Sequence, residues 1–262
     1  MSGVDWNGIL RLPEAALAGG RRIPKTVLAK QAMLTKTEQK RLDKVARLEH
    51  FGTVQKSTTR IPPHEDDERN VQSIVFLRCE MTAGTMAVAE VAELVHKCFP
   101  NPTVLLIEAS GCACVSVALT RKSQAEQGTT VVDSIEATGA FDPGRPGYAP
   151  FLDALDFAKL PQDDLLAYLQ GIAWAVRLSR SITSLGFYPI CADRNREQLG
   201  KLIARSDALA KEVSGNRQRR RDRGLSLNES AKLRVDAKRL EAEFDSVMGL
   251  IKSICTLGDT VE

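Results

Sequence analysis

Two apolar patterns near the C-terminus constrain the fold more than any other feature of the sequence. Apolar or small residues recur there at intervals of three and four, which places them on one face of an α-helix. Ser226 and Glu229 form a capping-box sequence in front of the second pattern. We therefore expect two helices that fold back on each other as an antiparallel coiled-coil hairpin. Its expected seam consists of Leu199, Leu202, Ser206, Leu209 and Val213, facing Leu233, Ala237, Leu240, Phe244, Val247, Ile251 and Ile254.

An arginine-rich segment lies between the two patterns. Gly215 and Gly224 bracket it, and we expect these ten residues to form the turn of the hairpin. Arginine pairs with phosphate groups through bidentate hydrogen bonds, so the segment is the candidate nucleic-acid-binding site. A solvated turn without a partner is the other interpretation. The five arginines, which we call the arginine tip, are Arg217, Arg219, Arg220, Arg221 and Arg223.

The middle of the chain alternates between strand and helix patterns. Residues 71–81 contain an apolar β-branched run, and residues 86–99 place apolar side chains at helical spacing. Two further strands, 103–109 and 112–120, flank a tight Ser-Gly turn, and 129–138 predicts a last strand. A strand, helix and strand in succession imply a crossover, after which hairpins follow. The sequence thus predicts an α+β fold with a mixed β-sheet and helices on one face.

Helices are expected in the part of the chain that precedes these strands. Residues 5–18 read as a short helix that stops at two glycines, and Thr35 or Thr37 is expected to cap a helix reaching Glu49. The acidic residues 65–68, which follow two prolines, predict a loop.

A loop rich in glycine and proline, residues 139–150, precedes the helical part of the chain. From Pro161 to Leu185 the sequence predicts one long, mostly apolar helix. The expected domains are an α/β body with N-terminal helices (1–145), a packed helical region (146–192) and the helical hairpin with its arginine tip (193–262).

Composition bounds the class of protein. With 262 residues, 43% of them hydrophobic, the chain is long enough to bury a core. Its apolar runs are much shorter than the roughly 20 residues that span a bilayer, and its first 20 residues lack a secretory pattern. We expect a cytoplasmic protein without a membrane segment. The scattered cysteines are expected to be reduced and largely buried.

Positive charge is concentrated near the two ends of the chain. Residues 21–60 hold eleven Lys and Arg against three acids, whereas residues 71–192 are mildly acidic. An anionic partner is expected to meet the ends first.

No catalytic, cofactor or metal site is recognisable in the sequence. It has no phosphate-binding glycine loop, and its histidines and cysteines lack the spacing of metal ligands. The hidden enzyme that fits best is a metal-dependent nuclease, because Glu80 and Glu108 each end a predicted strand. We therefore lean towards a protein that is not an enzyme and keep the nuclease as the alternative.

The N-terminal motifs resemble a known family. Ile23-Pro24-Lys25, followed by Thr35-Lys36-Thr37-Glu38-Gln39-Lys40, resembles the opening of the uncharacterised prokaryotic family called domain of unknown function 4391. The order of strands, helices and charged terminal coiled coil is also similar over nearly the whole chain. The resemblance implies a gene neighbourhood of helicases and DNA methyltransferases, as in restriction and phage-defence systems. The resemblance offers no established catalytic residues to carry over to this sequence. We thus expect an accessory or adaptor protein that binds a helicase or methyltransferase and, through the arginine tip, nucleic acid.

Overall fold

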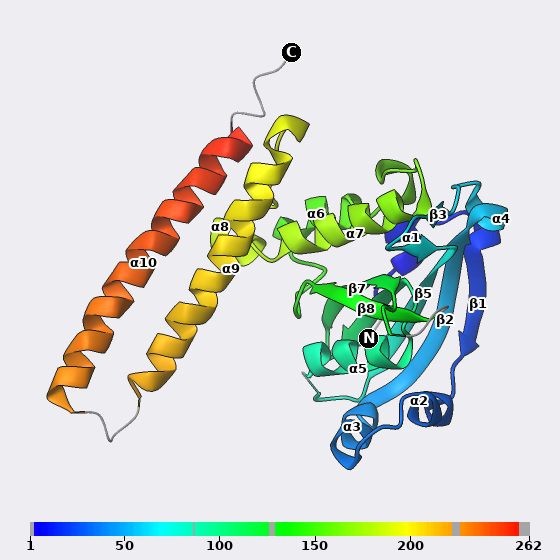
Figure 1. The fold of residues 1–262 in the computed structure, drawn as a ribbon, viewed down its shortest axis with the longest axis horizontal. Helices are drawn as coiled ribbons and strands as arrows, with labels where there is room; N and C mark the ends of the chain where they lie inside the picture. Colours follow the sequence, from blue (N-terminus) through cyan, green and yellow to red (C-terminus); the bar gives the residue numbers. More distant parts are fainter. Residues whose placement is uncertain (1–2, 86, 126–128, 222–225, 257–262) are drawn as a thin grey trace. The chain divides into compact units, whose positions relative to one another are not determined.

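The computed structural model describes residues 3–85, 87–125, 129–221 and 226–256. It divides into two compact units, of which the first is Met1–Arg180 and the second Ser181–Glu262. The first unit contains a β-sheet with helices around it, and the second is helical (Figure 1).

The first unit is built on a six-stranded mixed sheet. Its strand order is β1-β2-β5-β6-β7-β8, with β5 and β6 parallel and the other neighbours antiparallel. The expected strand, helix, strand and hairpin order is confirmed, including the turn at Ser110 and Gly111, which both have positive φ. The strands are β1 (Leu17–Arg22), β2 (Val45–Gln55), β5 (Ser73–Met81), β6 (Thr103–Ala109), β7 (Cys112–Lys122) and β8 (Thr130–Ala137).

Short and long helices of the first unit surround this sheet. Its 3-10 helices are η1 (Glu14–Ala16), η2 (Pro146–Tyr148) and η3 (Phe157–Lys159), and the second unit contains η4 (Asp193–Asn195). The α-helices of the first unit are α1 (Trp6–Leu10), α2 (Lys25–Gln31), α3 (Lys36–Leu42), α4 (Lys56–Thr59), α5 (Val88–Cys98), α6 (Ala149–Asp153) and α7 (Leu165–Ser179).

The α5 and α7 helices cover opposite faces of the sheet. His96 of α5 bonds through Nε2 to the Ser116 hydroxyl on β7, at 2.9 Å. Glu136 of β8 pairs in register with the residue after Ser116, and its carboxylate accepts hydrogen bonds from Arg177 and Arg180 at the end of α7. Successive strand side chains point to opposite faces, so these contacts lie on different sides. The predicted α+β fold with a mixed sheet is confirmed, and the helices lie on both faces of the sheet rather than on one. The burial of β6 agrees with this arrangement. Six of its seven residues are buried, as expected for a central strand of a sheet that is covered on both faces.

The N-terminal expectations were partly wrong. The expected helix 5–18 is the short α1 followed by η1 and the edge strand β1, which contains Gly19 and Gly20 at positive φ. Thr35 does cap α3 with a capping box to Glu38, but that helix ends at Leu42. The residues after it pair with β5 as strand β2, because cross-strand burial outweighs their weak helical pattern.

Two other segments differ from the expected elements. The acidic loop contains a small hairpin, β3 (His64–Glu65) and β4 (Asn70–Val71). The long helix expected from Pro161 starts later, because the Asp164 side chain caps it by accepting a hydrogen bond from Ala167 N at 2.7 Å. It ends at Ser179, and a separate short helix, α8 (Ile182–Leu185), belongs to the second unit.

Two long helices dominate the second unit. They are α9 (Arg196–Arg219) and α10 (Leu227–Thr256), which lie side by side and run in opposite directions (Figure 1). The capping box of Ser226 and Glu229 is formed as expected. Buried seam residues include Leu199, Leu209 and Ile251, whereas the expected seam residue Leu202 is only half-buried and Ile203 takes its place. Within the described residues, no helix has the length and apolar character needed to span a membrane.

Candidate functional site

The arginine tip lies at the end of α9. Arg217 is in the last helical turn, where its guanidinium forms an ion pair with Glu241 of α10 at 3.3 Å. Arg219 ends the helix, and Arg220 and Arg221 follow directly; Arg223 lies outside the described residues. The Arg219, Arg220 and Arg221 side chains are exposed and have no ionic partner among the residues that the structure describes. Three cations at the end of one helix are thus available to an anion.

The expected turn starts later than its glycine suggested. α9 continues through Gly215 to Arg219, so the described part of the tip is partly helical. A glycine inside a helix costs only about 1 kcal/mol relative to alanine. Contact with α10, including the Arg217 ion pair, offsets that cost. Arg219 is therefore the last residue of the helix.

The strand-end carboxylates come together, as the nuclease alternative requires. Glu80 on β5 and Glu108 on β6 are register partners at the end of the parallel strand pair. A hollow of about 380 Å³ lies beside them, with Ser110 and Cys112 in its lining. Placement at the carboxyl ends of parallel strands is where α/β sheets commonly bind ligands.

Glu108 is already engaged by the protein itself. Its carboxylate accepts hydrogen bonds from Arg78 Nε at 2.7 Å and from the buried Trp6 indole at 2.9 Å, and a further one from the Val4 amide at 3.3 Å. Glu80 lies 3.6 Å from the same guanidinium and is more exposed. The hydrogen bonds that Arg78 donates to Glu108 raise the pKa of Arg78. The pair therefore holds α1 and the strands together, and a metal would have to displace a guanidinium to reach Glu108.

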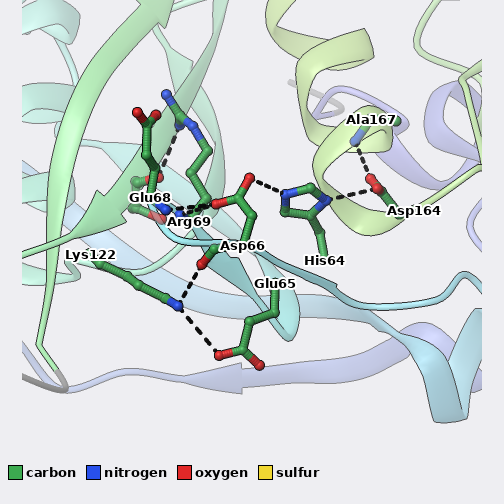
Figure 2. A network of polar contacts seen from close by, with 9 residues as sticks. His64, Glu65, Asp66, Glu68, Arg69, Lys122, Asp164 and Ala167 are labelled. Carbon is green, nitrogen blue, oxygen red and sulfur yellow. Dashed lines mark hydrogen bonds and ion pairs between the residues drawn. The ribbon is translucent and has the colours of Figure 1, made fainter.

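A third polar cluster centres on His64, which sequence reasoning did not single out. Figure 2 shows its imidazole between two carboxylates, with Nδ1 2.9 Å from Asp164 and Nε2 2.8 Å from Asp66. Asp66 also accepts hydrogen bonds from the Glu68 and Arg69 amides. The only hint in the sequence was a histidine beside an acidic run.

The His64 cluster fastens the β3–β4 hairpin to the start of α7. The hydrogen bonds to Asp66 and then Asp164 raise the pKa of His64 above its ordinary value. The same histidine, together with the two amides, lowers the pKa of Asp66 to about 2. Lys122 of β7 donates to the Asp66 carbonyl at 2.6 Å and so ties the hairpin to the sheet (Figure 2). Each polar group here has a partner, which is the pattern of a structural clamp.

The buried cysteines are poor nucleophiles. Four of the six are buried, and the partly exposed ones are Cys112 and Cys191. Burial raises the pKa of Cys79 to about 12 and also raises that of Cys114, so both thiols stay protonated near neutral pH.

Residues 21–60 contribute a second set of exposed cations. Arg41 and Lys44 form ion pairs with Glu90, and Arg47 pairs with the buried Glu49. Seven more cations are exposed or partly exposed and have no ion pair in the described part of the chain: Arg21, Arg22, Lys25, Lys36, Lys40, Lys56 and Arg60. Most of the positive charge seen in the sequence is therefore presented to solvent.

The comparison with protein families agrees with the N-terminal motifs. A family model described as Domain of unknown function (DUF4391) matches residues 10–244, which is most of the chain. The chain belongs to this family. No curated protein and no solved structure matches it. The DUF4391 match spans the whole sheet and most of the α9–α10 pair, so both units contain family sequence.

Proposed function

We propose that this DUF4391 protein is a non-catalytic accessory protein of a prokaryotic defence, restriction-like or DNA-processing system. In this proposal it binds a helicase or DNA methyltransferase and also contacts the phosphate backbone of nucleic acid. The observation that supports nucleic-acid binding is the exposed set Arg219, Arg220 and Arg221, which has no acidic partner among the described residues. The class of protein partner rests on the family resemblance, and we place the protein in the cytoplasm, where such partners act.

The tip is suited to phosphate rather than to bases. Arginine guanidinium groups match phosphate oxygens in bidentate geometry, and no aromatic side chain occurs between residues 211 and 226 to stack on bases. Binding through it should be insensitive to sequence and sensitive to salt. The heptad spacing of α9 and α10 supports a two-stranded coiled coil as the arm that carries this tip.

The competing proposal is a metal-dependent nuclease that uses Glu80 and Glu108. Their juxtaposition beside a hollow favours it, whereas the bonds from Arg78 and Trp6 to Glu108 favour a structural role. A nuclease would need both carboxylates free to bind the metal.

One experiment separates the two proposals. Labelled single-stranded and duplex DNA are incubated with the protein at about 50 mM salt, with and without Mg²⁺ or Mn²⁺, and binding and cleavage are both measured. We expect binding without cleavage, and weaker binding after Arg219→Ala, Arg220→Ala and Arg221→Ala are combined. Metal-dependent cleavage that Glu80→Gln abolishes would establish the nuclease instead. Absence of any binding by the wild-type protein would refute the nucleic-acid proposal.

A further inference from the structure

A groove on the first unit combines an apolar floor with two arginines. It has a volume of about 480 Å³ and lies across β1, β2 and β5, bounded by the start of α2 and the end of α5. Its apolar lining comes from Ile23, Pro24, Val27, Val75, Leu77 and Phe99. This volume and this mostly apolar lining are typical of sites that bind small organic groups.

The polar groups of the groove favour an anion. Arg21 and Arg22 line it, both are exposed, and neither has an ion pair or side-chain hydrogen bond in the described structure. As neighbours on β1 they point to opposite faces, and Arg21 is the one on the face that carries Leu77. Asn101 supplies a further polar side chain, and His50 and Thr53 also line the groove, where their side chains are hydrogen-bonded to each other at 2.7 Å. Among the described lining residues none is acidic. A ligand with one anionic and one flat apolar part would therefore find both of its contacts here.

Folding also supplies an aromatic side chain that the basic segment lacks. In the sequence, Phe51 is the one aromatic among residues 21–60, which argued against base stacking. The structure brings Phe99, from the end of α5, into the lining of the same groove as Arg21. Binding of single strands commonly combines cations that hold phosphates with apolar or aromatic surfaces that hold bases.

We propose that this groove binds one nucleotide of a single-stranded nucleic acid, with the phosphate at Arg21 and the base against the floor formed by Val27, Val75 and Phe99. The inference rests on the proposed function and deepens it. The arginine tip would contact backbone of any form, whereas the groove would distinguish single strands, whose bases are accessible, from duplexes.

The test compares a labelled oligothymidylate, an abasic oligonucleotide of equal length and a duplex. Val27 is 40% exposed, so Val27→Asp places a carboxylate in the groove with little expected effect on folding. We expect it to weaken oligothymidylate binding about tenfold and to leave duplex binding unchanged. The matched control Val235→Asp changes an exposed valine of α10, which is 68% exposed, and should alter neither.

Two further readouts keep the test decisive. Arg21→Ala should flatten the salt dependence of single-strand binding by about 0.7 in the log–log slope, which is the contribution of the one phosphate contact that is lost. The abasic strand should bind the wild-type protein less tightly than oligothymidylate.

Equal binding of both strands, or an unchanged affinity in Val27→Asp, would overturn the groove assignment while leaving tip binding intact. Tighter binding of an acidic peptide than of oligothymidylate would also overturn it, and loss of all nucleic-acid binding by the wild type would remove both proposals.

Discussion

Charged side chains serve different purposes in the sheet of the first unit and at the end of α9 in the second. On the sheet, Glu108 and Glu136 are buried or nearly so; Glu108 accepts charge-assisted hydrogen bonds from Arg78, and Glu136 accepts them from Arg177 and Arg180. At the end of α9, Arg219, Arg220 and Arg221 are exposed without an ionic partner in the described chain. Removing a charge from the sheet should therefore change stability, and removing one from the tip should change binding.

The largest effect is expected in the sheet core. Leu105 on β6 is fully buried, so Leu105→Ala should lower the free energy of unfolding by about 2 to 5 kcal/mol, through lost burial and the cavity left behind. Urea denaturation measures it. The control Leu250→Ala removes the same atoms from a half-exposed position on α10 and should cost less than about 1 kcal/mol. Similar losses in both variants would contradict the assignment of the core.

The next effect compares the two strand-end carboxylates. Glu108→Gln leaves Arg78 without its closest charge partner, and we expect a loss of about 2 to 3 kcal/mol in unfolding free energy. Glu80→Gln, at the more exposed neighbour 3.6 Å from the same guanidinium, should cost about 0.5 kcal/mol or less. If Glu80→Gln is the more damaging of the two, the structural role assigned to Glu108 is wrong.

A smaller effect tests whether α9 continues past its glycine. Gly215 has helical backbone geometry and open space at its Cβ position, so Gly215→Ala should stabilise the protein by up to about 1 kcal/mol. Gly186 ends α8 at a φ of 85°, where alanine is strained, so Gly186→Ala should destabilise it by about 1 kcal/mol. A turn beginning at Gly215 would instead make both substitutions unfavourable or neutral.

The His64 clamp predicts a pH dependence. Because its pKa is higher in the folded than in the unfolded protein, protonated His64 stabilises the fold fully below about pH 6.5, and this contribution disappears as pH rises through the raised pKa. The Tm difference between wild type and His64→Gln should therefore be largest near pH 6 and shrink at higher pH. A difference that grows from pH 6 to pH 9 would show that the neutral imidazole is the stabilising form.

Local patterns predicted the middle of the fold and both helix caps but not the N-terminal edge. Strong β-branched runs predict β5, β6 and β7, and the capping boxes at Thr35 and Ser226 mark helix starts, because these signals depend on nearby residues. The first part of β2 was expected to be helical, since its strand conformation comes from pairing with β5, which lies later in the chain.

The candidate sites also differ in whether the sequence alone reveals them. The arginine tip is a run in the sequence and was found there, as were Glu80 and Glu108. The hydrogen bond from Trp6 to Glu108 could not be predicted, because the two residues lie 102 positions apart in the chain. The His64 cluster and the groove beside Arg21 likewise form only when segments distant in the sequence meet.

The salt dependence of duplex binding tests the central claim, that the exposed cations of the tip bind phosphates and do not hold the fold. The variant Arg219→Ala, Arg220→Ala, Arg221→Ala should bind more weakly and should flatten the log–log slope by about 2.7, at about 0.9 for each lost contact, with an unchanged Tm. Its charge-matched control combines Lys159→Ala, Lys201→Ala and Lys211→Ala, exposed cations outside both basic regions, and should keep the wild-type slope. A wild-type slope in the tip variant, or an equal loss in the control, would contradict the account.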